Sequence, residues 1–533
     1  MPPIPSILII LVCTSLSVLD AADLPVKQNP VPPMASLVPE GKLVLAHYMT
    51  KMVPGGSGER DWASPELHDP KGSTAALGGL YLTLPLWSVL KPDLSLEEAV
   101  DFEIHCARQM GVDGFQFYYP FFKTEAPLRD YNRIVRAFVQ TAAKKYPGFK
   151  IALCLSLGGE YPELKEAQRI EIWGAALKEL LNETATSPAW LRTRSGSLLF
   201  YHWATDGFAD GADHMATTPE QIEKVAGAFA KLATRSGQAI DWVFHVRKTE
   251  NDPPYIEAIL KNFPAVWGWV EVDDDPAFWD RLAKRCAETG VAYTQTVYPE
   301  YFTSKVYALG DKHYQLLPVT EALKLGTGGI ERHYRQTDLA RGQARMLQSA
   351  IDRNAQIINY ATWNDWPEGQ HLAPEANHNF GPSLLLRHFA AEWRGQPSPL
   401  KDKAILFFKK HPSTAQPPNP IAVKVKSRRN EPTAEDEVQL VTNLTSPARC
   451  EFNGRDAGQV SAGFQITSLP LPADGPMHVR LLNHETDKAI IDFTTPLGLT
   501  RSPLRVDRLT YSYSSNFTEE FRALFGNAKP VTP

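Results

Sequence analysis

The chain has 533 residues, a formal net charge of -5 at pH 7 and 43% hydrophobic residues, a composition typical of globular proteins. The slight acidity, with no basic cluster larger than Lys424, Lys426, Arg428 and Arg429, argues against nucleic acid as a main partner. A chain of this length exceeds a single compact core, so one large domain and one smaller domain are expected.

The N-terminal residues include an apolar stretch, 7–19, that is too short to cross a bilayer and is followed by two alanines. This pattern predicts a secretory signal peptide over residues 1–22 and a secreted or periplasmic protein. A signal retained as an anchor stays open, because no Lys or Arg precedes the apolar stretch. No other stretch approaches the length of a membrane span. The Pro-rich residues 23–40 predict a linker.

Strand and helix patterns alternate from residue 41 to residue 395. Helix starts are marked by caps such as Ser95 with Glu98, which form a predicted capping box. Eight strands that alternate with helices predict a closed (β/α)8 TIM barrel, and an open doubly wound sheet is the alternative. The alternative is less favoured because no Gly-x-Gly-x-x-Gly follows the first strand. The predicted strands cover residues 43–48, 114–119, 149–157, 197–203, 242–246, 265–270, 291–296 and 355–360.

Two further segments complete the predicted organisation. The interval 298–335, before the last barrel strand, reads as a long loop, and loops of that length in compact domains are usually functional. Beyond residue 395 short strand patterns predict a small β-sandwich domain over residues 396–515 and a tail over 516–533, with a short helix near 518–525. The predicted strands of this domain are 404–408, 421–425, 438–441, 479–482 and 490–494.

The densest group of reactive side chains follows the eighth predicted strand, in Thr362-Trp363-Asn364-Asp365-Trp366-Pro367-Glu368-Gly369. Its two carboxylates, Asp365 and Glu368, would lie at the carboxyl end of a barrel strand, where parallel barrels place their chemistry. Glycosidic hydrolysis needs such a pair, one protonated as general acid and one ionised as nucleophile or as base for a water. Spacing alone is a weak signal, because carboxylate pairs are common on protein surfaces.

Aromatic and polar side chains also fall near the carboxyl ends of other predicted strands, where a barrel would gather them into one cleft. Aromatic faces suit stacking on sugars, although each such residue taken singly is more often structural. The four cysteines after the signal segment lack metal-ligand spacing, and no His-x-His, His-Glu-x-x-His or Gly-x-Ser-x-Gly occurs, so no metal, other cofactor or serine nucleophile is expected. The predicted substrate-binding residues are His47, Tyr48, Tyr119, Trp203, Trp269, Tyr298, Trp363, Asn364, Trp366 and His371.

The motif at 362–369 resembles the Trp-Asn-Asp-Tyr-Gly-Glu-Ser motif of glycoside hydrolase family 71, the α-1,3-glucanases or mutanases. The resemblance covers roughly residues 41–412 and implies a (β/α)8 barrel with an accessory β-sandwich, an inverting mechanism, and Asp365 and Glu368 as the catalytic pair. Further matches run in the same order through Lys42–Met49, Gly111–Phe115, Gly148–Lys150, Pro299–Thr303 and Ala404–Pro412.

This chain also departs from the family. Pro367-Glu368-Gly369 stands where the family has Gly-Glu-Ser, and Ser156-Leu157 replaces a Phe-Asp pair, so a substrate-contacting carboxylate is missing. Similar Trp-Asn-Glu-Trp-Gly-Glu patterns occur in family 99-like α-mannan enzymes. Glu271 or Asp273 could supply a third carboxylate.

The hypothesis from sequence is a secreted, monomeric glycoside hydrolase that cleaves α-linked polysaccharide, most simply endo-α-1,3-glucan, by inversion. Glu368 is favoured as the acid and Asp365 as the base. Its expected partner is a poly- or oligosaccharide, with no nucleic acid and no membrane contact beyond the signal segment. An α-mannan or other α-glycan hydrolase and a carbohydrate-binding barrel without turnover are the alternatives.

Overall fold

The computed structural model describes residues 36–54, 65–247, 253–311, 315–425, 435–505 and 507–531. The predicted signal peptide and most of the predicted linker lie outside these residues. The described end of that linker is not a free connector, because Val38 is fully buried and Leu37 O accepts a hydrogen bond from Arg194 N at 3.1 Å. Within the described parts of the chain, the helices are all too short or too polar to cross a bilayer.

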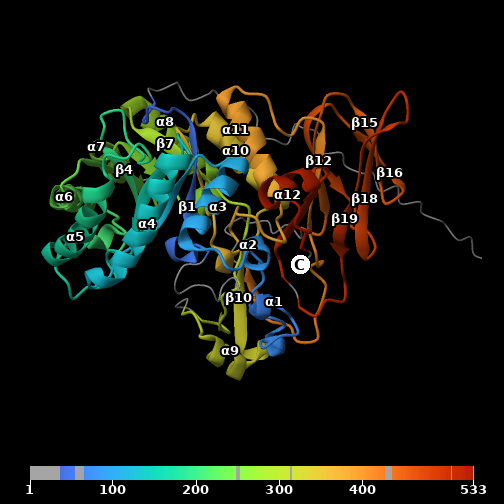
Figure 1. Cartoon of the computed structure of the whole chain (residues 1–533), viewed down its shortest axis with the longest axis horizontal. Coiled ribbons are helices and arrows are strands. Elements are labelled where there is room, and N and C mark those ends of the chain that lie inside the picture. Colours follow the sequence, from blue (N-terminus) through green and yellow to red (C-terminus); the bar gives the residue numbers. More distant parts are fainter. Residues whose placement is uncertain are drawn as a thin grey trace, which may run out of the picture.

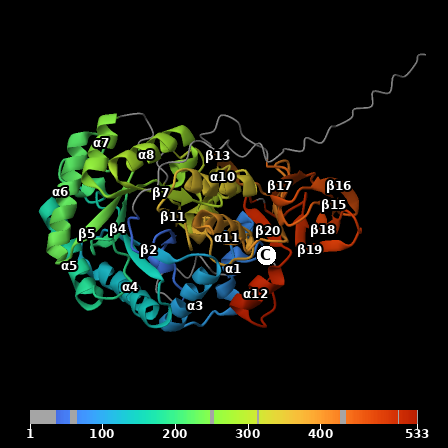
Figure 2. The same cartoon turned by 90° about the horizontal axis from the view of Figure 1, so that it is seen from above.

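Eight parallel strands close into a barrel in the order β1-β11-β7-β6-β5-β4-β3-β2, which confirms the predicted TIM barrel (Figures 1 and 2). The first and last strands in sequence close the barrel as neighbours, with Leu43 opposite Ile357. The strands are β1 (Leu43–Tyr48), β2 (Gly114–Pro120), β3 (Lys150–Ser156), β4 (Leu198–Trp203), β5 (Ile240–His245), β6 (Ala265–Trp267), β7 (Ala292–Val297) and β11 (Ile357–Tyr360).

Helices surround the barrel, and Figure 2 shows them as a ring outside the strands. The helix Leu96–Gln109, which follows an insertion after β1, begins at the capping box of Ser95 and Glu98, as predicted. The outer helices are α3 (Leu96–Gln109), α4 (Glu125–Lys145), α5 (Glu166–Thr184), α6 (Pro219–Ser236), α7 (Pro253–Asn262), α8 (Pro276–Thr289), α10 (Leu339–Asp352) and α11 (Gly381–Arg394). The insertion after β1 forms η2 (Thr50–Met52), α1 (Pro65–His68), η4 (Ala75–Leu77) and α2 (Leu86–Leu90). Two more short turns are η5 (Asp206–Phe208) and η6 (Val270–Asp273).

Side chains along each barrel strand alternate between the inside of the barrel and the layer of surrounding helices. On β1, Leu43 and Leu45 pack inside the barrel with residues such as Trp267, whereas Val44 and Tyr48 pack against the helices. This alternation decides which residue of a neighbouring pair can reach the mouth of the barrel.

The interval 298–335 is not the long loop that the sequence predicted but a small sheet that projects from the barrel (Figure 1). Its strands β8 (Tyr301–Phe302) and β9 (Tyr307–Ala308) pair antiparallel with β10 (Ile330–Arg335). Between them lie α9 (Val319–Leu325) and η7 (Thr327–Gly329). The segment β13 (Ala422–Val425) joins this sheet beside β10, although the sequence placed it in the sandwich.

The C-terminal part forms the predicted sandwich from two antiparallel sheets, β17-β14-β12-β20 and β16-β15-β18-β19. Leu406 and Leu440 of one sheet share a core with Val479 of the other. The last helix, α12 (Phe517–Phe525), lies where a helix was predicted and returns to the barrel, where Phe525 and Phe102 have ring centroids 5.7 Å apart. The strands are β12 (Lys403–Lys409), β14 (Val438–Leu444), β15 (Ala448–Phe452), β16 (Arg455–Val460), β17 (Gly463–Leu469), β18 (Gly475–Asn483), β19 (Ala489–Leu499) and β20 (Thr510–Ser514).

Candidate active site

The motif after β11 folds as a tight turn, η8 (Trp366–Glu368), at the carboxyl end of the barrel. Thr362 closes this turn, since its Oγ1 donates to Gln370 O at 3.0 Å and accepts from Asp365 N at 2.8 Å. Gly369 follows with a φ of 69°, and a Cβ there would lie 2.6 Å from a β8 carbonyl oxygen. The backbone that carries the two motif carboxylates is therefore fixed by local contacts.

Two other loops hold the same turn from outside. The carbonyl oxygen of Pro367 accepts hydrogen bonds from Thr303 Oγ1 at 3.1 Å and from Ser304 N at 2.6 Å. From the insertion after β1, Thr83 Oγ1 donates to Trp366 O at 2.9 Å. The motif turn is thus held by segments inserted into the regular barrel.

Glu368 meets two hydrogen-bond donors at the mouth of the barrel. Lys305 Nζ lies 2.7 Å from its Oε1, and Gln370 Nε2 donates to its Oε2 at 2.7 Å. Its side chain is 21% exposed, whereas Asp365 is 6% exposed. Burial favours the neutral amine of Lys305, but the charges of Glu368 and Asp365 outweigh burial and raise the pKa of Lys305. One cation therefore faces both carboxylates.

Tyrosines frame the two carboxylates. Burial, together with the negative charges of Glu368 and Asp365, raises the pKa of Tyr301 well above its ordinary value. The same causes raise the pKa of Tyr307 to about 12, although Lys305 opposes them. Both phenols therefore keep their protons at neutral pH and are available as hydrogen-bond donors.

An aromatic cluster occupies the mouth beside β1 and β4. The His47 ring meets Trp269 edge-on with centroids 5.0 Å apart, and Trp269 lies 6.1 Å from Trp203. Both tryptophans are partly exposed, and the Arg247 guanidinium lies over Trp203 at 5.9 Å. Burial lowers the pKa of His47 to about 4, so its ring is neutral at pH 7. Tyr118 lies near both groups, because its ring is 6.1 Å from His47 and the charge of Asp365 adds to burial in raising its pKa.

Three of the predicted substrate-binding residues face the helix layer instead of the mouth of the barrel. Tyr48, Tyr119 and Trp363 are fully buried. Tyr119 Oη donates to Asn132 Oδ1 at 2.8 Å, and Trp363 Nε1 donates to Glu103 Oε2 at 2.5 Å. Because side chains alternate along a strand, a residue next to an inward one points outward. These three side chains belong to the packing between strands and helices.

Four more predicted residues are buried under the mouth rather than exposed on it. Asn364 Oδ1 accepts from Met49 N at 2.7 Å and so ties the motif to the loop after β1. Trp366 packs on His371 with centroids 4.7 Å apart, and Tyr298 is fully buried in the core around the barrel. The predicted residues that the structure brings together at the mouth are Asp365, Glu368, His47, Trp203 and Trp269.

Sequence reasoning missed Lys305, Tyr301 and Tyr307, because all three lie in the interval that was read as a loop. A usable signal was present, since two tyrosines and a lysine occur within seven residues directly after a barrel strand. The side chains of Glu271 and Asp273, considered as a third carboxylate, lie outside the described residues.

A buried group beneath the turn could hold a metal ion, which the sequence did not predict. His371, Glu375 and His378 each offer a ligand atom within 4.8 Å of the others. The same side chains also form a buried ionic network. Burial opposes charge on His378, but Glu300 and Glu375 raise its pKa. Lys409 of β12 lies 3.1 Å from Glu300, so the network joins the barrel to the β-domain.

No protein-family profile and no curated protein sequence matches this chain. Among solved structures, it is similar to a GH99 endo-α-mannosidase from Bacteroides thetaiotaomicron, with 14% identity over 66% of this chain and 96% of that one and a TM-score of 0.42. A glycoside hydrolase-like protein gives 11% identity, coverage of 70% and 98%, and a TM-score of 0.41. The β-glucuronidase 2 of Bacteroides uniformis gives 11% identity, coverage of 77% and 44%, and a TM-score of 0.40. Likenesses this distant assign no activity, which has to be argued from the site.

Proposed function

We propose that this protein is a glycoside hydrolase that cleaves an α-linked polysaccharide at the mouth of its barrel. The observation that carries the proposal is that Asp365 and Glu368 share one clamped turn and one cation, Lys305, at the carboxyl end of the barrel. Glycosidic hydrolysis uses two carboxyl groups, one as general acid and the other as base or nucleophile. Trp203 and Trp269 supply faces on which sugar rings can stack.

The hydrogen bonds of Glu368 bear on the roles of the two carboxyl groups. Both of its oxygens accept from a donor, Lys305 Nζ and Gln370 Nε2, an environment that suits a group taking a proton from water better than one giving a proton to a leaving oxygen. We therefore assign the base that activates water to Glu368 and the acid that protonates the leaving oxygen to Asp365. This is the reverse of the assignment favoured from sequence.

The substrate class is proposed from the motif. Its resemblance to the α-1,3-glucanases makes an α-1,3-glucan the first candidate and inversion the expected outcome. The similarity of the motif to that of α-mannan enzymes makes α-mannan the second candidate.

Release of reducing sugar from α-1,3-glucan, other α-glucans and α-mannan tests the proposal. We expect release from one of these polymers and none from the Asp365→Asn and Glu368→Gln variants. Sedimentation of the protein with each polymer separates binding from turnover. A protein that sediments with a polymer but releases no sugar from any of them would be a carbohydrate-binding barrel instead.

A further inference from the structure

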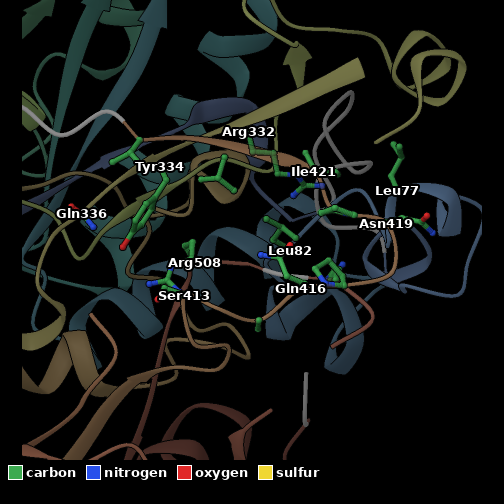
Figure 3. Close-up of a pocket in the computed structure, with 16 residues that line it drawn as sticks. Leu77, Leu82, Arg332, Tyr334, Gln336, Ser413, Gln416, Asn419, Ile421 and Arg508 are labelled. Atoms are coloured by element: carbon green, nitrogen blue, oxygen red, sulfur yellow. The ribbon is translucent and has the colours of Figure 1, made fainter. Parts of the chain in front are cut away.

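A cavity lies on the opposite face of β10 from the candidate active site. Along β10, His333 stacks on Tyr307 at the active-site face with centroids 4.1 Å apart. Its neighbours Arg332 and Tyr334 point the other way and line a cavity of about 340 Å³. The remaining walls come from β13, the segment 413–421, the chain before β20 and, with Leu77 and Leu82, the insertion after β1. Figure 3 shows Arg332 and Ile421 on one side of the cavity and Ser413 with Gln416 on the other.

The lining of this cavity carries an excess of positive charge. Three arginines line it, Arg332, Arg505 and Arg508, and among its described lining residues there is no Asp or Glu. Arg505 Nη1 donates to Tyr81 O at 3.0 Å, and Arg508 Nη1 donates to His411 O at 3.0 Å. The other polar residues that line the cavity are uncharged. Tyr334 Oη donates to Glu435 and Ser413 Oγ donates to Asp436, whereas the amides of Gln336, Gln416 and Asn419 can donate to a ligand.

Arg332 is the side chain that points to a ligand. It is 2% exposed, and its Nη2 donates to Leu80 O at 2.8 Å. Its Nε and Nη1 have no hydrogen-bond partner in the described part of the chain. Burial, together with nearby Arg505, lowers the pKa of Arg332 to about 9 although the charge of Asp507 opposes them, so Arg332 still carries its charge at neutral pH. A buried charge without a partner strongly destabilises a fold, so natural proteins rarely leave one uncompensated.

Arg353 shows how this protein normally satisfies a buried guanidinium. It is 4% exposed, and its three nitrogens donate to Asp280 Oδ1 at 2.8 Å, Gln295 Oε1 at 2.8 Å and Pro276 O at 3.1 Å. Arg332 is equally buried, but among the described residues no carboxylate accepts a hydrogen bond from it and its Nε and Nη1 lack acceptors. Arg332 lines the cavity, so a ligand bound there would be in place to supply the acceptors that its Nε and Nη1 lack.

We propose that this cavity binds a small oxyanion whose carboxylate, phosphate or sulfate oxygens accept hydrogen bonds from Arg332. Its volume admits a group up to about the size of a monosaccharide, within the lower range of small-molecule pockets. Guanidinium is the side-chain group best matched to such oxygens, and the neutral polar residues would fix the orientation of the rest of the ligand. The site is separate from the proposed glycosidase chemistry and does not depend on it.

Titrations of the purified protein with inorganic phosphate, sulfate, glucuronate and glucose test this site. Calorimetry and the thermal midpoint are followed in a buffer without other oxyanions. We expect one of the three anions to bind with a single-site isotherm and to raise Tm, because a ligand that binds only the folded state stabilises it. Tighter binding of glucuronate would identify an acidic sugar, and tighter binding of phosphate or sulfate a free or esterified anion. Glucose, the neutral counterpart, should have no effect.

Arg332→Met keeps the bulk of the side chain and removes its charge. We expect the anion to bind at least about tenfold more weakly, the order expected for loss of a charge-assisted hydrogen bond. In anion-free buffer Tm should stay the same or rise, because a buried unpaired charge has been removed. Arg353→Met is the matched control and should lower Tm while leaving the anion-dependent gain in Tm intact.

Asn419→Trp is a second variant that leaves the buried residues unchanged, because Asn419 is exposed at the cavity wall. The larger ring should fill the cavity and weaken anion binding while the protein keeps its Tm in anion-free buffer. Absence of binding by all three anions, or an equal gain in Tm in Arg332→Met and the unmodified protein, would overturn the proposal.

Discussion

Lys305 Nζ lies 2.7 Å from Glu368 Oε1, although the two residues are 63 positions apart in the chain. Lys305 stands between β8 and β9, outside the regular barrel, whereas Glu368 follows the last barrel strand. The projecting sheet therefore supplies a charged group that the eight strands alone do not. The candidate active site is therefore built from both the projecting sheet and the barrel.

The first prediction concerns this cation. Lys305→Met should lower kcat by about tenfold or more, in line with the loss of a charge-assisted contact at a reacting group. The acidic limb of the pH–rate profile should move to higher pH, because the proposed base, Glu368, loses its counter-charge. Lys324→Met removes an exposed lysine of α9, between β9 and β10, which is paired with Glu321, and serves as the control. An unchanged profile in Lys305→Met would make the ion pair structural only.

The second prediction concerns the two carboxyl groups. Asp365→Asn and Glu368→Gln keep the shape of each side chain, so folding should be retained while kcat falls by roughly 10²-fold or more. Far-ultraviolet circular dichroism and Tm report the fold, and initial rates on the best polymer report kcat. If both variants work at near the normal rate, the catalytic assignment has to be given up.

The sequence located the barrel well because its strands are apolar runs bounded by turns, and most predicted strand ends fall within two residues of the observed ones. It could not find β8 and β9, because two residues are too few to show a period. It placed 421–425 in the sandwich since a strand pattern does not reveal its partner, and β13 pairs with β10 instead. Local patterns thus predict elements more reliably than they predict pairing.

The candidate site was harder to predict for a related reason. Two strands end in a pair of neighbouring residues that are both plausible ligand-binding residues, His47 with Tyr48 and Tyr118 with Tyr119. In each pair one residue points inward and the other packs on the helices, and a shift of one position reverses the outcome. The sequence does not show which member of each pair points inward, and only the observed strand register does.

The third prediction distinguishes aromatic residues that bind substrate at the mouth of the barrel from those that pack between strands and helices. Trp203→Ala and Trp269→Ala should raise KM with little change in Tm, because both side chains are partly exposed at the cleft. Trp363→Ala should instead destabilise the protein by about 3–5 kcal/mol, the usual cost of truncating a buried aromatic. A large rise in KM in a folded Trp363→Ala protein, without a change in Tm, would contradict this division.

The fourth prediction uses Glu103, whose buried carboxyl accepts from Trp363. Burial raises its pKa in the folded protein from 4.5 to about 7. The folded state therefore binds more protons than the unfolded state between these values, and stability should fall as pH rises from about 4.5 to about 7. Glu103→Gln should gain stability relative to the unmodified protein at pH 8 but not at pH 4, by up to about 3 kcal/mol.

Chemical denaturation at both pH values measures this difference. Glu97→Gln, on the same helix but at its exposed start, is the control and should show no such dependence. An equal gain at pH 4 and pH 8 would mean that Glu103 does not change its ionisation between those conditions.

The last prediction concerns the stereochemistry of the reaction. An inverting enzyme keeps a water between its base and the anomeric carbon, which places the two carboxyl groups roughly 6.5–9.5 Å apart, against about 5–5.5 Å in a retaining enzyme. Asp365 and Glu368 come from one turn in which Pro367 stands between them, and Lys305 holds Glu368 toward the projecting sheet. We expect this arrangement to separate the two groups and leave room for the water.

NMR of the first product, before mutarotation, decides between inversion and retention. An α-linked substrate should first release the β-anomer if Glu368 activates water on the face opposite the leaving group. The same experiment with Glu368→Gln and added azide tests the role of Glu368, because a small nucleophile can replace the activated water and form a β-glycosyl azide. First release of the α-anomer by the unmodified protein would rule out inversion and require one carboxylate to act as a nucleophile.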